Sequence, residues 1–232
     1  MALTKLGALV QDIRGSQNGL TFSRNKGGSY VRAKVSPTQP RTAAQLAVRA
    51  NLATSSKNWS GQLSAAERSA WAGFASANTK TNVFGDTTHI SGFQWFMGLN
   101  QVLKQINSTT ITSPPSDLSV GSNLTPESVD METSPPYATL SFNAGTVDAN
   151  TDAYIFATPS LQQGITPGES LYRYIGTTTL TTSTIAQSVN ISDLYFPKFG
   201  APIAGKSVWF LISNVNTQTG ATTVGQKIVG QV

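Results

Sequence analysis

Residues 111–232 consist of short runs rich in Thr, Val, Ile and Tyr, and turn residues separate these runs. About six or seven runs follow one another at a spacing near ten residues or somewhat more, which is typical of an antiparallel β-sandwich. The clearest runs are Tyr137–Phe142, Ala153–Thr158, Leu171–Gly176, Ile185–Val189, Val208–Val215 and Val224–Val229. This half of the chain therefore has to bury its apolar side chains between two sheets.

The chain has no Cys, so the disulfide of antibody domains, zinc–thiolate sites and thiol catalysis are excluded. We expect the sandwich to be closer to fibronectin type III than to immunoglobulin domains. The segment 108–116 contains Pro114-Pro115 and predicts a boundary, so we expect 111–232 to fold by itself. The side chains expected to point inwards are Leu140, Phe142, Ile155, Trp209 and Leu211.

Three helices are predicted before this boundary. Thr42 with Gln45, Ser64 with Glu67 and Ser91 with Gln94 each match the capping box that marks a helix start. Helical spacing then gives each helix one apolar stripe. The stripes are Val48, Leu52 and Trp59; Ala70, Trp71, Phe74 and Ala75; and Phe96, Leu99, Leu103 and Ile106. We interpret Trp59, Trp71 and Trp95 as core residues rather than as a binding platform.

Residues 1–41 predict a β-hairpin arm. Apolar and polar residues alternate from Gly19 to Ser23, Asn25-Lys26-Gly27-Gly28 suits a turn, and a second run extends from Ser29 to Val35. Tyr30, Arg32 and Lys34 then share one strand face. The predicted fold class is α+β and β-rich, with a basic hairpin arm (1–41), a helical domain (42–110) and a β-sandwich of fibronectin III or immunoglobulin type (111–232).

Charge is divided unevenly along the chain. Residues 1–110 hold twelve Lys or Arg and three Asp or Glu, a net charge of +9, whereas residues 111–232 have a net charge of −4. Oppositely charged ends favour head-to-tail contacts or an acidic partner at the basic end. Charged residues make up only 12% of the chain, about half the usual share, as suits surfaces that pack against copies or neighbours.

Residues that would carry catalysis or bind a metal are not grouped in the sequence. His89 is the single histidine, and no nucleophile or acid is placed beside it by any motif. Asp148 to Asp152 resembles the start of a calcium loop, but Ala153 and Pro159 replace the required Gly and Glu, so a tight turn is the better interpretation. Asp130 and Glu132 are interpreted as solvated acids rather than a glycosidase pair. We expect no enzyme, cofactor or metal.

The candidate partner-binding residues are Arg24, Lys26, Tyr30, Arg32, Lys34 and Arg41. This mixture of cations with one aromatic ring fits contact with an acidic protein surface, a solvated hairpin face, or nucleic acid.

An ordered set of short motifs runs through residues 7–105. It includes SRNKGGSYVR from Ser23 to Arg32, then Pro37-Thr38-Gln39-Pro40-Arg41-Thr42, Trp59-Ser60, Leu63-Ser64, Trp71, Phe84-Gly85 and Ser91-Gly92. In this order the motifs resemble a loosely defined family of small proteins encoded among phage and prophage structural genes, some with a fibronectin-like domain. The resemblance implies a virion component without catalytic residues, at the head, neck or tail.

We therefore expect a phage virion structural protein, such as a capsid decoration or a neck or tail accessory subunit. It would be a homo-oligomer or part of a symmetric assembly, binding other virion subunits through its basic end. The alternatives are a nucleic-acid-binding protein and a carbohydrate-binding accessory module. The first residues lack a secretory apolar region and no run approaches about 18 apolar residues, so we expect no membrane contact and synthesis in the host cytoplasm.

Overall fold

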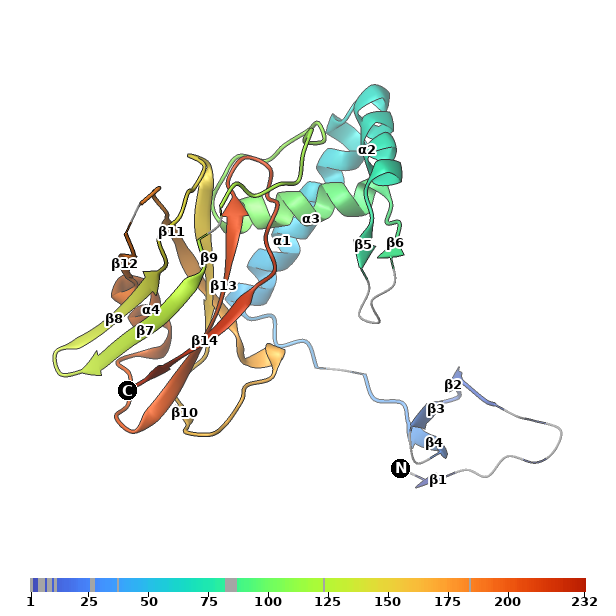
Figure 1. Ribbon diagram of the computed structural model, residues 1–232. Coiled ribbons are helices and arrows are strands. Elements are labelled where there is room, and N and C mark those ends of the chain that lie inside the picture. Colours follow the sequence, from blue (N-terminus) through green and yellow to red (C-terminus); the bar gives the residue numbers. More distant parts are fainter. Residues whose placement is uncertain are drawn as a thin grey trace. The chain divides into compact units, whose positions relative to one another are not determined.

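The computed structural model describes residues 2–3, 7, 10, 12–25, 28–36, 38–81, 87–122, 124–183 and 185–232. The chain divides into two compact units, Met1–Ala47 and Val48–Val232, drawn in Figure 1. The boundary falls within the first helix, α1 (Ala43–Lys57). The division into three parts, with limits after residues 41 and 110, stays a prediction. The second compact unit contains both the helices after Val48 and the sandwich.

The first unit contains a four-stranded antiparallel sheet with the order β1-β4-β3-β2. Its strands are β1 (Ala2–Leu3), β2 (Gly15–Gln17), β3 (Leu20–Asn25) and β4 (Gly28–Ala33). Strands β3 and β4 form the predicted hairpin. Strands β1 and β2 were not predicted, since runs of two and three residues show no alternation. Asn18 and Gly19 join β2 to β3 with φ angles of 44° and 78°, as two-residue hairpin turns require.

The helices begin where the capping boxes predicted. In α2 (Ala65–Ala77) and α3 (Gly92–Gln105) the boxes of Ser64 and Ser91 are complete. For α1, Thr42 Oγ1 accepts the Gln45 N–H at 3.3 Å. A π-helical turn (η1, Asn58–Gln62) follows α1, and β5 (Lys80–Thr81) pairs with β6 (Thr87–Thr88). Among the residues that the structure describes, no helix is long and apolar enough to cross a membrane.

An aromatic core holds the helices of the second unit together. Trp71 is fully buried, and its ring packs edge-on against Phe96 at 5.6 Å between centroids, while Phe74 packs edge-on against Trp95 at 5.5 Å. Such pairs add about 0.5–1.5 kcal/mol each beyond their buried area. Trp71 and Trp95 are buried and Trp59 is partly buried, which confirms these tryptophans as core residues.

The stripe predicted for α1 is mostly uncovered, which corrects the sequence-based expectation. Val48 and Leu52 are 66% and 52% exposed. The buried α1 residue is instead Ser55, whose hydroxyl accepts hydrogen bonds from Gln101 Nε2 and Lys104 Nζ, both at 2.9 Å. Helical spacing correctly places Val48 and Leu52 on one side, but no described element packs over them.

The remaining strands form two antiparallel sheets. One has the order β12-β8-β7, and the other has the order β10-β13-β9-β11 with β14 paired to β13. The strands are β7 (Pro126–Thr133), β8 (Pro136–Phe142), β9 (Thr151–Ala157), β10 (Leu161–Gln162), β11 (Arg173–Thr179), β12 (Gln187–Asn190), β13 (Lys206–Asn216) and β14 (Gln226–Gln231). One apolar cluster lies between the sheets. This is the fibronectin type III or immunoglobulin-like sandwich architecture, so the chain is α+β and β-rich as predicted.

The sandwich core confirms part of the predicted set. Leu140, Phe142 and Ile155 are fully buried. Trp209 and Leu211 are only partly buried, and the prediction that they point inwards is wrong. The inward residues of β13 are Val208, Phe210 and Ile212, which alternate with them. Because Val208 to Ile212 are all apolar, the sequence does not show which alternate residues of β13 face the core.

A short helix within the sandwich was not predicted. This helix, α4 (Ser192–Phe199), lies between β12 and β13 in the chain and contains Pro197. Its Tyr195 is fully buried, and the hydroxyl donates to the Thr158 carbonyl at 3.3 Å. A further short turn, η2 (Glu169–Leu171), precedes β11. Because proline disfavours a helix interior, a run of eight residues that contains one is not predicted as a helix from its sequence pattern.

The segment 108–116 is fixed to the helices. Trp71 Nε1 donates to the Thr112 carbonyl at 2.7 Å, and the buried Asn100 amide bonds both backbone groups of Ile111. Further along, Tyr154 of β9 donates to Gln105 Oε1 of α3 at 2.7 Å. The helical part and the sandwich are therefore linked by side-chain bonds, and independent folding of 111–232 stays a prediction.

Candidate partner-binding site

The basic candidates of the arm are distributed over both faces of its sheet. Strand register sets Tyr30 opposite Ser23, Arg32 opposite Thr21 and Arg24 opposite Ser29. Side chains alternate along a strand, so Tyr30 and Arg32 share a face and Arg24 lies on the other. Lys26 lies outside the described residues. The predicted set is therefore not one contiguous patch.

The two faces of this sheet differ in polarity. Tyr30 and Arg32 share theirs with Ser23 and Thr21, and the Thr21 hydroxyl bonds that of Ser16 at 3.0 Å. The opposite face carries Leu20, Phe22, Val31, Ala33 and Arg24. None of the side chains described in residues 7–47 is buried, and Leu20 is 44% exposed. A sheet of this size normally needs a packed face for stability, and neither face is packed by the part of the unit that is described.

The arm has a strong excess of positive charge. Residues 1–47 hold seven Lys or Arg and one acid, a net charge of +6. That acid is Asp12, whose Oδ2 lies 2.9 Å from Arg14 Nε. The ion pair is exposed, so it stabilises the fold by at most about 1 kcal/mol. No described carboxylate forms an ion pair with the cations at the remaining described candidate positions, which are Arg24, Arg32, Lys34 and Arg41. All four side chains are exposed, as a charge that contacts an external partner has to be.

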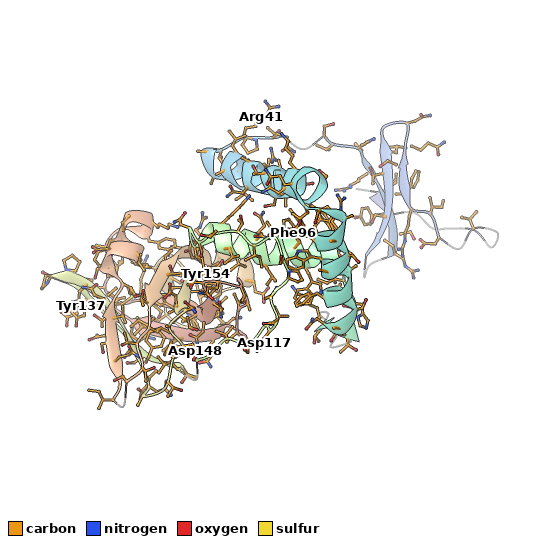
Figure 2. The ribbon with its side chains drawn as sticks, turned by 90° about the horizontal axis from the view of Figure 1, so that it is seen from above. Arg41, Phe96, Asp117, Tyr137, Asp148 and Tyr154 are labelled. Carbon is orange, nitrogen blue, oxygen red and sulfur yellow. The ribbon has the colours of Figure 1, made fainter. Side chains whose placement is uncertain are left out.

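Lys34 and Arg41 lie beyond the sheet. The Lys34 N–H donates to the Gly19 carbonyl at 2.7 Å, so the hairpin contact continues one residue past β4. Arg41 has a φ of 50° and comes two residues before α1, where Figure 2 labels it. Both side chains are exposed.

A second surface feature, the α1–α3 groove, was missed by sequence reasoning. It has a volume of about 480 Å³, and its lining is largely apolar, with Leu52 at 52% and Phe93 at 37% exposure. The lining residues are Arg49, Leu52, Ala53, Ser56, Phe93, Gln94 and Met97. Phe93 lies outside the predicted stripe of α3, and a large aromatic residue off the buried stripe was the signal that could have revealed this groove.

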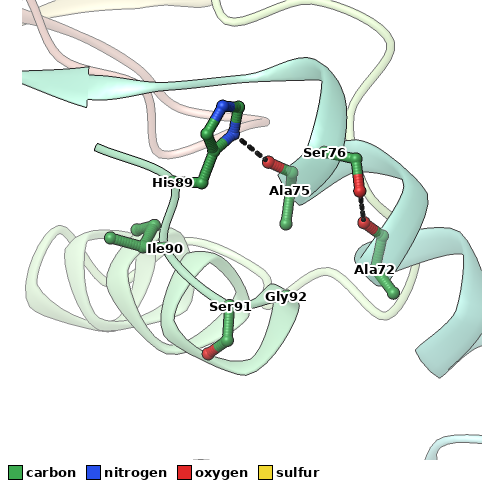
Figure 3. A pocket seen from close by; sticks show the side chains of 7 residues that line it. All are labelled: Ala72, Ala75, Ser76, His89, Ile90, Ser91 and Gly92. Carbon is green, nitrogen blue, oxygen red and sulfur yellow. Dashed lines mark hydrogen bonds between the residues drawn. The ribbon is translucent and has the colours of Figure 1, made fainter. Parts of the chain in front are cut away.

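His89 lies in a shallow pocket between α2 and the start of α3 (Figure 3). Its Nδ1 is 3.4 Å from the Ala75 carbonyl oxygen. The two serines of the pocket are engaged elsewhere, because Ser76 donates to the Ala72 carbonyl and Ser91 caps α3. No carboxylate is among the described lining residues. This arrangement offers neither the nucleophile–base contact nor the base–acid contact of a catalytic triad.

Asp130 and Glu132 are both exposed on β7. The Tyr137 hydroxyl, labelled in Figure 2, donates to Asp130 Oδ2 at 3.0 Å. This bond, with Glu132 nearby, raises the pKa of Tyr137 to about 12. The two acids thus lie on an open strand surface, as expected of solvated carboxylates.

The Asp148 segment is a turn. The Thr151 N–H donates to the Asp148 carbonyl at 3.0 Å, and β9 starts at Thr151. Over the residues that the structure describes, no three His, Cys, Asp or Glu side chains gather closely enough to hold a metal ion.

No protein-family model matches the sequence, and no curated protein matches it. Among solved structures, the chain is similar to a Fn3-like protein from Clostridium thermocellum. The identity is 16%, the match covers 49% of this chain and 91% of that chain, and the TM-score is 0.27. The fold of the sandwich therefore rests on the strand order and the core described above.

Proposed function

We propose that this protein is a structural subunit of a phage particle that docks through its basic arm and displays its fibronectin-like sandwich. The observation that carries the proposal is the arm sheet, in which no described side chain is buried. A four-stranded sheet of which the described part of its unit packs neither face gains little free energy from folding alone, and a neighbouring subunit would supply the missing packing.

Charge supports a protein partner for this arm. With a net charge of +6 and cations at Arg24, Arg32 and Arg41 that form no ion pair with any described carboxylate, the arm complements an acidic protein surface. The ordered motifs of residues 7–105, which resemble proteins encoded among phage structural genes, support a virion. The proposal includes head decoration, neck and tail positions, with synthesis in the host cytoplasm.

A nucleic-acid-binding role is the second candidate, favoured by one observation. Tyr30 and Arg32 share a face of β4, which places a stacking ring beside a cation. Arg24 on the opposite face does not contribute to that platform, so the acidic protein surface remains our preferred partner. No observed feature favours the carbohydrate-binding alternative.

The test reverses two arm charges in the double variant Arg32→Glu, Lys34→Glu and measures incorporation into purified particles by immunoblot and electron cryomicroscopy. We expect incorporation to be lost while the circular dichroism spectrum is unchanged, because each desolvated ion pair lost costs about 2–5 kcal/mol. Arg173→Glu, an exposed charge reversal on β11, is the matched control and should incorporate normally.

Normal incorporation of the double variant would refute docking by these cations. If DNA affinity also fell steeply with salt and dropped in the double variant, the nucleic-acid candidate would replace the proposal.

A further inference from the structure

Strands β7, β8 and β12 form one sheet of the sandwich (Figure 1), and its outward face, which we call the acidic face, carries negative charge. Val129 and Met131 of β7 pack against the sandwich core, so alternation places Asp130 and Glu132 on the outward side, where both are exposed. Glu127 of the same strand adds a third acid. None of the three strands contains a Lys or Arg, so the acidic face has no positive charge of its own.

The two outward carboxylates are not neutralised within the described chain. Asp130 Oδ2 accepts a hydrogen bond from the Tyr137 hydroxyl at 3.0 Å, and Tyr137 lies opposite Glu132 in the strand register. Neither carboxylate forms an ion pair with a described cation. The neighbouring outward residues of β8 and β12 add hydroxyl and amide groups, and they are Thr139, Ser141, Ser188 and Asn190. The acidic face is therefore suited to a polar partner surface that brings two cations.

The polar face of the arm sheet has these properties. Arg32 lies on this face of β4 beside Tyr30, and continued alternation places Lys34 on the same side. Both cations are exposed, and neither forms an ion pair with a described carboxylate. Residues two apart on a strand are separated by about 6.5 Å, so the two cations have the same spacing as the two acids. The two surfaces thus match in polarity, in charge and in the distance between their charges.

Acids elsewhere in the described chain do not offer such a pair. Asp12 is paired with Arg14, Glu67 belongs to the capping box of α2, and the Asp117 carboxylate accepts hydrogen bonds from Ser119. The described acids that share no strand face with a second acid are Asp148, Asp152, Glu169 and Asp193. Charge and spacing therefore select the acidic face among the described surfaces of this chain.

We propose that the polar face of the arm binds the acidic face of a second copy of this chain, where Arg32 and Lys34 pair with Asp130 and Glu132. The inference rests on the proposed function and names the partner of the arm cations. Net charges of +6 on residues 1–47 and −4 on residues 111–232 add attraction at longer range. Two copies that exchange arms close a two-fold dimer, and a one-way contact builds a ring or a filament. The apolar face of the arm is left for a different virion subunit.

The test measures self-association of the purified full-length chain by sedimentation equilibrium over a range of concentration and salt. The acid variant Asp130→Asn, Glu132→Gln and the arm variant Arg32→Glu, Lys34→Glu should each weaken association about tenfold or more, with unchanged circular dichroism. Glu169→Gln neutralises an exposed acid outside both surfaces, so this matched control should associate like the unchanged chain. Higher salt should weaken association of the unchanged chain, because exposed ion pairs are screened.

A mixture of the two variants tests whether arm and acids contact each other. The acid variant retains the arm cations and the arm variant retains the acids, so one intact contact can form between them. The mixture should therefore give heterodimers that grow no further. A mixture that associates no better than either variant alone would overturn the inference, because the arm and the acids would then belong to separate contacts.

An unchanged chain that stays monomeric at all concentrations would also overturn the inference, as would an acid variant that associates like the unchanged chain. Incorporation into particles, measured in parallel, separates this failure from failure of the proposed function. If the arm variant is lost from particles while the acid variant still self-associates normally, the arm docks on another virion subunit and only the inference fails. If both variants lose self-association while the arm variant incorporates normally, the contact between copies stands and docking through the arm cations is refuted.

Discussion

Replacement of Asn100 by Ala tests whether the segment after α3 is held to the helices. The Asn100 side chain is 1% exposed, and its amide bonds three backbone groups. Nδ2 donates to the carbonyls of Phe96 and Ile111 at 3.0 and 3.1 Å, and Oδ1 accepts the Ile111 N–H at 2.8 Å. Alanine removes all three bonds and leaves the two Ile111 groups without these partners.

The expected loss follows from the burial of Ile111. A buried backbone group left unsatisfied costs about 1–3 kcal/mol, and Ile111 is only partly buried, so water reduces the cost toward about 1 kcal/mol for each group. The higher helix propensity of Ala offsets up to about 0.7 kcal/mol of this total. We expect a net loss of about 1.5 kcal/mol, which lowers Tm by about 3–6 °C in a unit of this size.

The assay is urea and thermal unfolding of the full-length chain followed by circular dichroism, with an unchanged m-value as the sign that compactness is retained. Asn51→Ala is the matched control, because Asn51 is an exposed α1 residue, and it should show no loss of unfolding free energy and a gain of up to about 0.7 kcal/mol from the helix propensity of Ala. If Asn100→Ala, like the control, showed no loss of unfolding free energy, the reasoning would be refuted, and segment 108–116 would then act as the free linker that its prolines suggested.

Two further predictions concern local hydrogen bonds. Ser64→Ala should lower the unfolding free energy by about 1 kcal/mol, because the capping box of α2 is lost; equal urea midpoints for variant and parent would contradict this. Tyr137 should deprotonate near pH 12 rather than at its ordinary pKa of 10.0, as followed by phenolate absorbance in the difference between the chain and Tyr137→Phe. Its hydrogen bond to Asp130 stabilises the fold fully below pH 10 and is lost between about pH 10 and 12, since a raised folded-state pKa favours the neutral phenol. In Asp130→Ala the titration should move back toward 10.0, and an unmoved titration would show that Asp130 is not the cause.

Local signals in the sequence predicted the elements well. The reciprocal bonds of Ser64 with Glu67 and of Ser91 with Gln94 involve residues three apart, so the sequence alone contains both partners. The β3–β4 hairpin and the sandwich strands likewise follow from alternation over a few residues. Strand β7 and helix α4 were not recognised. In β7 the alternation is limited to Val129 and Met131, which lie between exposed acids, and in α4 Pro197 interrupts the helical pattern.

Prediction failed where a result depends on distant neighbours. In β13 the residues on both faces of the strand are apolar. Only pairing with β9 and β14 decides that Phe210 points inwards and Trp209 does not. The arm candidates failed to form one patch for a similar reason. Arg24 and Arg32 are on different strands, and their relative faces depend on the register between β3 and β4; the turn between the strands sets that register, whereas our sequence analysis assigned faces only within the second run.

The apolar stripe of α1 shows that the function, too, depends on neighbours that the sequence pattern does not identify. Periodicity states which side chains share a face, and hydrophobicity makes burial of that face favourable, but neither identifies the molecule that covers it. Leu52 matches the pattern of a core residue yet remains half exposed, while the sandwich residues of similar pattern are buried within the chain. Exposed apolar side chains occur in both halves of the sequence: Leu20, Leu52 and Phe93 lie in the basic half, and Ile185 and Val224 lie in the sandwich. In the arm, an acidic protein surface over Leu20 would satisfy hydrophobic burial and charge at once, which is why we favour assembly over an isolated monomer.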